Sequence, residues 1–82
     1  MENKFLERIV IDPEIMAGKP VIRGTRVPVE HIIRAVAQGR TFEEILADWP
    51  HLAREDIQAA LFYGADLVAG EEVFPLKVEG DT

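Results

Sequence analysis

Apolar residues recur along the chain with two different spacings, and the change of spacing separates a short β region from a helical region. Residues 8–12 are rich in β-branched side chains and are followed by Pro13, which predicts a strand. Residues 21–23 form a second short apolar run, bordered by turn-forming residues at Gly18 and Gly24, and predict a second strand. We expect the two strands to pair with each other, or the first to pair with its copy in a second chain.

Three helices are predicted downstream, over residues 29–38, 41–49 and 54–69, because apolar residues recur there three and four positions apart. Their apolar stripes are Val29, Ile32, Ile33 and Val36, then Phe42, Ile45, Leu46 and Trp49, and then Ile57, Ala60, Leu61, Gly64, Ala65 and Val68. The predicted fold is therefore mainly α with a short N-terminal β element.

The ends of these helices also carry sequence signals. Pro28 suits the first position of a helix, and Gly39 suits the left-handed residue that follows one. Thr41 and Glu44 have the spacing of a capping box, in which each side chain accepts the other residue's backbone N–H. Pro50 ends the second helix, since the residue before a proline avoids helical geometry.

The third helix has apolar residues outside its stripe, at Phe62, Tyr63 and Leu67. A domain of 82 residues has a small core and gains stability from an interface with another chain. We therefore predict a homodimer that uses these three residues together with Ile9 and Ile11 of the first strand. The alternative is that the β hairpin covers this second face within one chain.

Composition and charge narrow the class of protein. The chain is 48% hydrophobic and 29% charged, which is typical of a globular domain, and it has no cysteine for disulfides or thiolate metal sites. No apolar run suggests a secretion signal or a membrane span, so we expect a cytoplasmic protein. Residues 1–26 carry five cations against four acids, whereas residues 27–82 carry four against eleven. This acidic balance argues against a free-standing DNA-binding protein, because phosphate contacts need cations.

Catalytic patterns are nearly absent. The two histidines, His31 and His51, have no partner at a catalytic or metal-binding spacing. The run from Gly18 through Lys19 to Pro20 lacks the glycine spacing of a phosphate-binding loop. We therefore expect no enzyme activity, no metal, no cofactor and no small-molecule substrate.

Residues 11–29, which read IDPEIMAGKPVIRGTRVPV, resemble the signature of the family called domain of unknown function 433 (DUF433). The later matches are Gly39, the FEEIL run at 42–46, Trp49 with Pro50, and the DIQAAL run at 56–61. The resemblance implies a three-helix, homeodomain-like helix-turn-helix domain over residues 1–70, with residues 71–82 as a tail. One departure is Ala53, where the family usually has a Ser or Thr that caps the third helix.

The resemblance also implies a function, since some members of the family are regarded as antitoxins of PIN-like ribonucleases. We therefore predict a non-catalytic interaction module, a type II antitoxin that binds a PIN-like toxin and takes part in operator binding within the complex. The alternatives are a stand-alone DNA-binding transcriptional regulator and a structural homodimer. If the chain bound DNA as a regulator, the third predicted helix would enter the major groove, although its first turn carries two acids against one cation.

Candidate site residues follow from these hypotheses. A guanidinium can pair bidentately with a carboxylate, and PIN-like nucleases hold their metal in a carboxylate cluster. The candidates for partner binding are Lys19, Arg23 and Arg26, with Phe74, Leu76 and Val78 of the tail adding a strand to the partner's sheet. The candidates for DNA binding are Arg34, Arg40 and Arg54. A purely structural alternative is that Arg26 pairs with Asp12 or Glu14 to hold the turn.

Overall fold

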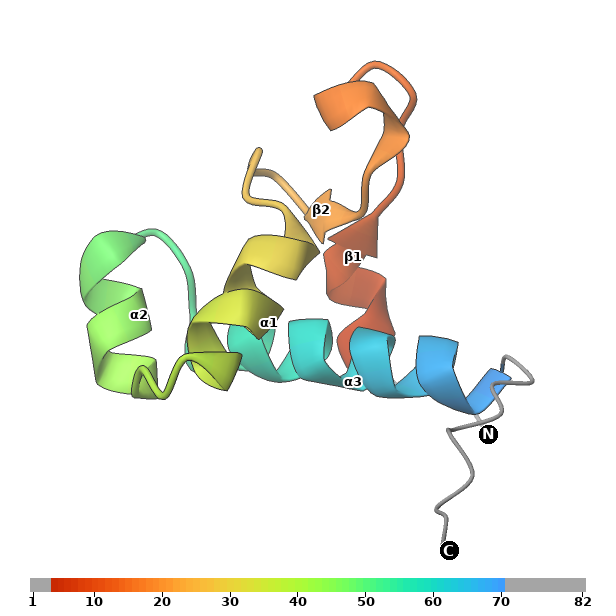
Figure 1. Ribbon diagram of the computed structural model, residues 1–82. Coiled ribbons are helices and arrows are strands. Elements are labelled where there is room, and N and C mark those ends of the chain that lie inside the picture. Colours follow the sequence, from red (N-terminus) through yellow and green to blue (C-terminus); the bar gives the residue numbers. More distant parts are fainter. Residues whose placement is uncertain (1–3, 71–82) are drawn as a thin grey trace, which may run out of the picture.

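A short antiparallel sheet and three helices make up most of the computed structural model, which describes residues 4–70 of the chain (Figure 1). The elements in chain order are the 3₁₀ helix η1 (Lys4–Arg8), strand β1 (Ile9–Val10), the 3₁₀ turn η2 (Met16–Gly18), strand β2 (Val21–Ile22), and the helices α1 (Val29–Ala37), α2 (Phe42–Asp48) and α3 (Arg54–Gly70). The prediction of a mainly helical domain with an N-terminal β element is confirmed.

The two strands pair within the chain, as the first of the two sequence expectations proposed. Ile9 lies opposite Ile22 and Val10 opposite Val21 in an antiparallel register. The first strand is shorter than predicted, because Arg8 belongs to η1 and the chain leaves the ladder after Val10. Each strand thus contributes only two residues to the sheet within residues 4–70.

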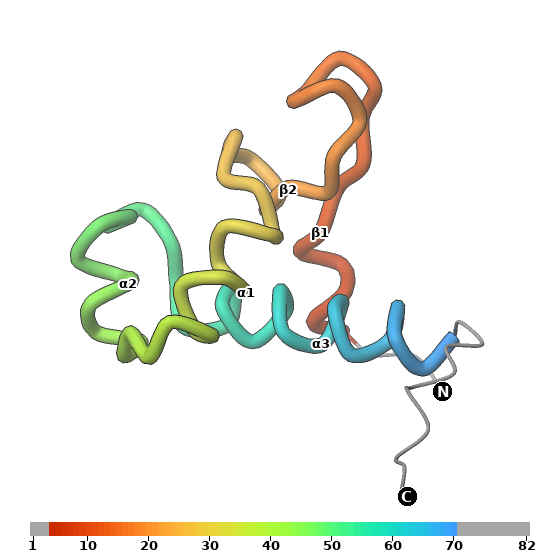
Figure 2. The backbone as a smooth tube through the Cα atoms, in the orientation of Figure 1, coloured from red at the N-terminus to blue at the C-terminus, as the bar shows by residue number. Residues whose placement is uncertain are grey.

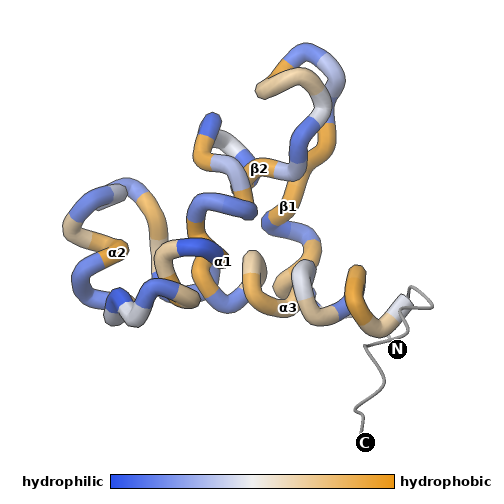
Figure 3. Tube along the Cα trace, in the orientation of Figure 1, coloured by the Kyte–Doolittle hydropathy of each residue, from blue (hydrophilic) through white to orange (hydrophobic). Residues whose placement is uncertain are grey.

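The core lies where the hairpin meets the three helices. One isoleucine from each helix has no exposed surface, Ile32 in α1, Ile45 in α2 and Ile57 in α3. From the hairpin, Val21 and Ile22 are almost completely buried against the helical layer. Figure 3 colours parts of α1 and α3 as hydrophobic, and both helices contribute residues to the core cluster. The predicted stripes of α1 and α2 are confirmed, since their remaining members pack against this cluster.

The helix ends agree with the sequence signals except at Pro28. The capping box is present, with the Glu44 N–H donating to Thr41 Oγ1 at 3.1 Å and the Thr41 N–H donating to Glu44 Oε1 at 2.9 Å. Gly39 follows α1 with a φ of 90°, the left-handed value expected there. Pro28 was predicted at the first helical position, but its ψ of 139° is extended and α1 begins at Val29. The difference arises because Pro28 forms a β-bridge with Val21 instead.

The stripe predicted for α3 is buried only in its first half. Ile57 and Ala60 belong to the core, whereas Val68 is 67% exposed. The reason is length, because the nine residues of α1 span about 13 Å and the seventeen of α3 about 25 Å. The C-terminal turns of α3 therefore extend past the helix on which they would pack, as Figure 1 shows.

The helix η1 was not predicted from the sequence, and it covers part of the second face of α3. The Phe5 ring stacks on the Phe62 ring with centroids 5.2 Å apart. Tyr63 packs against the core cluster. Part of the second apolar face is thus covered within one chain, and η1 supplies the aromatic ring that lies over Phe62.

The start of α3 is capped in a way that compensates for Ala53. The Ala53 N–H donates to Asp56 Oδ2 at 2.8 Å, which is the half of a capping box that needs no side chain at the N-cap. The other carboxylate oxygen of Asp56 accepts a charged hydrogen bond from Arg8 Nη1 at 3.0 Å. Asp56 is only 8% exposed, so this pair ties the end of η1 to the first turn of α3.

Candidate functional site

Two neighbouring segments project from the helical layer on the hairpin side of the molecule (Figure 2). The first, called here the 11–20 loop, connects β1 to β2, and the second, the 23–28 turn, connects β2 to α1. They are joined at their bases, because the Val29 N–H donates to the carbonyl of Pro20 at 2.9 Å. Three of the predicted partner-binding residues lie on them.

The 23–28 turn is held by its own side chain and backbone. The Thr25 hydroxyl donates to the Ile22 carbonyl at 2.7 Å and accepts the Val27 N–H at 3.0 Å. Gly24 has a φ of 78°, a conformation that costs glycine little. These two hydrogen bonds and one left-handed glycine thus fix the backbone that carries the two arginines of the turn.

Arg23 and Arg26 are exposed, and neither side chain makes a hydrogen bond or ion pair within the part of the chain that the structure describes. The pairing of Arg26 with Asp12 or Glu14, proposed as a structural alternative, is not formed. Asp12 instead accepts the Glu14 N–H through Oδ1 at 2.9 Å, a local turn. Both guanidiniums are therefore available to another molecule.

Lys19 differs from the two arginines because it has an intramolecular partner. Its ammonium lies 3.4 Å from Glu30 Oε2, and both side chains are about half exposed. A surface pair of this kind contributes about 0–1 kcal/mol and is weakened by salt. Lys19 can therefore exchange Glu30 for another carboxylate at little cost.

The 11–20 loop contains two non-glycine residues in the left-handed region. Met16 has a φ of 51° and Ala17 a φ of 57°, and each costs roughly 1–2 kcal/mol relative to ordinary backbone. Three backbone hydrogen bonds oppose this strain. The N–H groups of Ile15, Gly18 and Lys19 donate to the carbonyls of Asp12, Ile15 and Met16 at 2.8, 3.1 and 3.1 Å.

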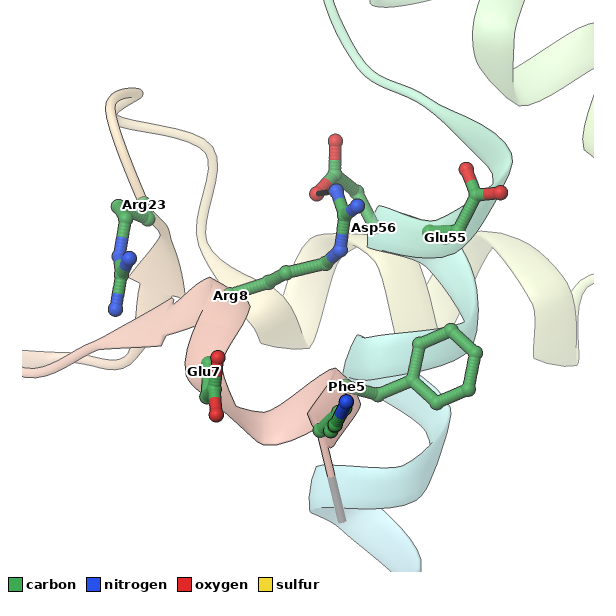
Figure 4. A pocket seen from close by; sticks show the side chains of 7 residues that line it. Phe5, Glu7, Arg8, Arg23, Glu55 and Asp56 are labelled. Atoms are coloured by element: carbon green, nitrogen blue, oxygen red, sulfur yellow. Dashed lines mark hydrogen bonds and ion pairs between the residues drawn. The ribbon is translucent and has the colours of Figure 1, made fainter.

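A polar cleft of about 560 Å³ lies between η1, the hairpin and the start of α3 (Figure 4). Its lining side chains belong to Lys4, Phe5, Glu7, Arg8, Arg23, Glu55 and Asp56. Figure 4 shows Arg8 reaching from η1 toward Asp56, while the Arg23 N–H donates to the Arg8 carbonyl at 2.7 Å. The backbone of Arg23 is thus linked through Arg8 to α3. This connection was not predicted from the sequence. The available signal was Asp56, an acid three residues after Ala53, which is the spacing at which a carboxylate can cap the start of a helix.

The three arginines considered for DNA binding differ in their surroundings. Arg40 pairs with Asp48, whose hydrogen bond raises the pKa of the guanidinium above its ordinary value. The guanidinium carbon of Arg54 lies 4.6 Å from the centre of the Phe42 ring, a cation–π contact. Arg34 is exposed and forms no ion pair with any other residue in the range 4–70. Two of the three cations are therefore engaged by groups of α2.

The residues considered for a dimer differ in their surroundings. Ile9 and Tyr63 pack against the core, and Phe62 contacts Phe5. Ile11 and Leu67 are 58% and 48% exposed, but one lies at the start of the 11–20 loop and the other near the end of α3. The tail residues Phe74, Leu76 and Val78 lie outside the described residues.

Residues 4–70 contain neither a cluster of potential metal ligands nor a helix able to span a membrane. No group of three histidine, aspartate or glutamate side chains there is placed to hold a metal ion. None of the helices in that range combines the length and apolar character needed to cross a membrane. The two histidines are both exposed, on α1 and in the connection before α3.

Comparison with known proteins places the chain in a family. Residues 9–64 match the family model described as protein of unknown function DUF433, so the chain belongs to this family. A crystal structure of a DUF433 member from Anabaena variabilis aligns with a TM-score of 0.70 at 35% identity, covering 77% of this chain and 62% of that one.

Two curated relatives carry no functional description in their names. The uncharacterized protein y4eO of Sinorhizobium fredii is 44% identical over 57 residues, which are 70% of this chain but 26% of that protein. An uncharacterized protein of Archaeoglobus fulgidus is 55% identical over 29 residues, which are 35% of this chain and 81% of that protein. This chain therefore spans about a quarter of the length of the Sinorhizobium protein.

Proposed function

We propose that this chain is a non-catalytic interaction module, a type II antitoxin that binds and silences a PIN-like ribonuclease in the cytoplasm. The observation that carries the proposal is the pair of exposed guanidiniums, Arg23 and Arg26, which are unpaired within residues 4–70 and stand on a fixed turn. A guanidinium that enters a metal-binding carboxylate cluster forms two parallel charged hydrogen bonds. The fixed turn reduces the entropy lost when the arginines dock.

The finer fold that we propose is a homeodomain-like helix-turn-helix, with α2 and α3 as the paired helices. Five residues, 49–53, connect α2 to α3, and Figure 1 shows the two helices crossing at a steep angle. This arrangement is compatible with helix-turn-helix geometry. In such a domain α3 would be the recognition helix, and its first turn presents Arg54 and Glu55 to solvent while Asp56 is buried.

We expect weak DNA binding by the isolated chain. The formal net charge is −6, and Arg40 and Arg54 already contact Asp48 and Phe42. Any binding should depend on Arg23, Arg26 and Arg34 and fall steeply as salt rises, since it rests on phosphate contacts. Fluorescence anisotropy with a random duplex at physiological salt checks this expectation. Tight binding there would favour a stand-alone regulator, whereas operator binding by the toxin complex alone would agree with the proposal.

A homodimer is the second candidate, favoured by an apolar groove on the exposed half of α3. The groove is lined by Ile33, Leu61, Gly64, Ala65, Leu67, Val68 and Ala69. The C-terminal part of α3 from Gly64 onward carries a single charged residue, Asp66, so two copies meet there with little repulsion. We therefore propose a second copy of this chain as the occupant of the groove.

Sedimentation velocity tests the homodimer. The parent chain is expected to sediment as a dimer at micromolar concentration. Leu67→Asp should shift it to the monomer, because the variant places a charge in the groove. Glu43→Ser, on the exposed face of α2, is the matched control and should leave the dimer intact. A monomeric parent chain would rule out the dimer.

A nuclease inhibition assay tests the proposed function. The partner to use is the PIN-like nuclease encoded next to the gene of this chain, with cleavage of a labelled RNA as the readout. Stoichiometric addition of the chain is expected to stop cleavage. Undiminished cleavage, or the lack of any such neighbouring gene, would count against the antitoxin and in favour of the regulator or the homodimer.

A further inference from the structure

The 11–20 loop exposes apolar side chains that contribute nothing to the core. Ile11 is 58% and Met16 39% exposed, and Ile15 is partly exposed. None of the three belongs to the core cluster or packs against it. Figure 3 shows hydrophobic positions within this projecting loop, well away from the helical layer. These three side chains of one short loop are called here the apolar tip, and apolar residues exposed close together along a chain are candidates for an interaction site.

The 11–20 loop has a defined conformation in the chain without a partner. Met16 and Ala17 are held in the left-handed region by the hydrogen bonds that run from Ile15, Gly18 and Lys19. Strain of this kind persists only where the surroundings impose it, and it is typical of recognition and switch segments. A loop that is already ordered loses little conformational entropy on docking. The apolar tip is therefore presented in a fixed position.

Cations border the apolar tip. Lys19 belongs to the loop itself, which also carries Asp12 and Glu14. Arg23 and Arg26 lie on the neighbouring 23–28 turn, so the cations outnumber the acids by one over the loop and the turn together. Residues 1–26 carry a net positive charge within a chain whose overall charge is −6. An apolar centre with a charged rim is the usual anatomy of a protein interface. A surface complementary to it would have an apolar pocket beside a cluster of carboxylates.

We propose that the 11–20 loop is the apolar anchor of the partner interface, with Met16 inserting into a pocket next to the carboxylates that Arg23 and Arg26 engage. This inference rests on the proposed function, in which those carboxylates are the metal-binding cluster of the nuclease. A methionine suits the role because its unbranched side chain adapts to an irregular pocket. Burial of the Met16 side chain would add apolar area removed from water to the interface, which the exposed arginines do not contribute.

Two glycine substitutions distinguish the contribution of the Met16 side chain to binding from the contribution of the loop backbone. Met16→Gly and Ala17→Gly both relieve a left-handed residue, so both should keep or raise the melting temperature. Met16→Gly is expected to weaken binding to the neighbouring nuclease about tenfold or more, the loss typical of an interface hot spot. Ala17→Gly, which removes one methyl group, should bind like the parent chain. Isothermal titration of purified nuclease and thermal denaturation measure the two effects.

Each outcome of this experiment is decisive. Parent-like binding by Met16→Gly would overturn the anchor while leaving the antitoxin function intact. Equal weakening by both variants would also overturn it, because the shape of the backbone rather than the Met16 side chain would then make the contact. A parent chain that does not bind the nuclease would overturn this inference and the proposed function together.

Discussion

Replacement of Asp56 by alanine is expected to lower the free energy of unfolding by about 3 kcal/mol, a large part of the stability of so small a domain. Asp56 is 8% exposed and makes two contacts at once, with the Ala53 N–H and with Arg8. Loss of a helix cap costs about 1 kcal/mol, and loss of a partly buried charged hydrogen bond costs about 1.5–3 kcal/mol. Urea denaturation followed by circular dichroism measures the change.

Arg8→Met is the matched control for this variant. It removes the ion pair but keeps both the Asp56 cap on Ala53 and the apolar stem of the side chain. The expected loss is about 2 kcal/mol, smaller than for Asp56→Ala by the roughly 1 kcal/mol that the cap contributes. Equal losses in the two variants would show that the cap contributes nothing. Parent-like stability of Asp56→Ala would contradict the role given to this residue.

The second large effect concerns recognition rather than stability. The double variant Arg23→Ala and Arg26→Ala is expected to weaken inhibition of the neighbouring nuclease about a hundredfold or more, as loss of two paired charges in an interface does. Its free energy of unfolding should change by less than about 0.5 kcal/mol, since both side chains are exposed and unpaired within residues 4–70. RNA cleavage titrations and urea denaturation measure the two quantities.

Arg34→Ala is the control for the double variant. Arg34 is another exposed arginine without an ion pair among the residues described, but it lies on α1 rather than on the 23–28 turn. Its replacement removes one positive charge, against two in the double variant, from a different element and should leave inhibition unchanged. Equal weakening by Arg34→Ala would indicate that net charge, and not the turn, governs the association.

The helices were predictable because each carries a repeating apolar stripe. The capping box of Thr41 and Glu44 fixed the start of α2 from four consecutive residues. Periodicity alone misleads in α3, where the apolar stripe of the sequence continues to Val68 although Val68 itself is exposed. Periodicity shows which side of a helix is apolar, but the length of the neighbouring helix decides how much of that side is buried.

Three features of the candidate site lay beyond sequence reasoning for different physical reasons. The helix η1 has five residues, too few for a periodic pattern, and its contacts with α3 depend on tertiary packing. Left-handed Met16 and Ala17 were not foreseen because residues with a Cβ rarely adopt that conformation. The pairing of Arg40 with Asp48 crosses the whole of α2, a separation at which spacing rules for helices say nothing.

Metal competition tests the central claim most directly, since the proposed contact places guanidiniums of the 23–28 turn in the carboxylate cluster that binds the metal of the nuclease. Titration of the chain into the purified nuclease would be repeated at increasing Mn²⁺ concentration and constant ionic strength, with Mg²⁺ as a second series. The account predicts that the apparent affinity falls as either metal is raised, because arginine and metal compete for the same oxygens. An affinity that stays constant across both series would contradict it.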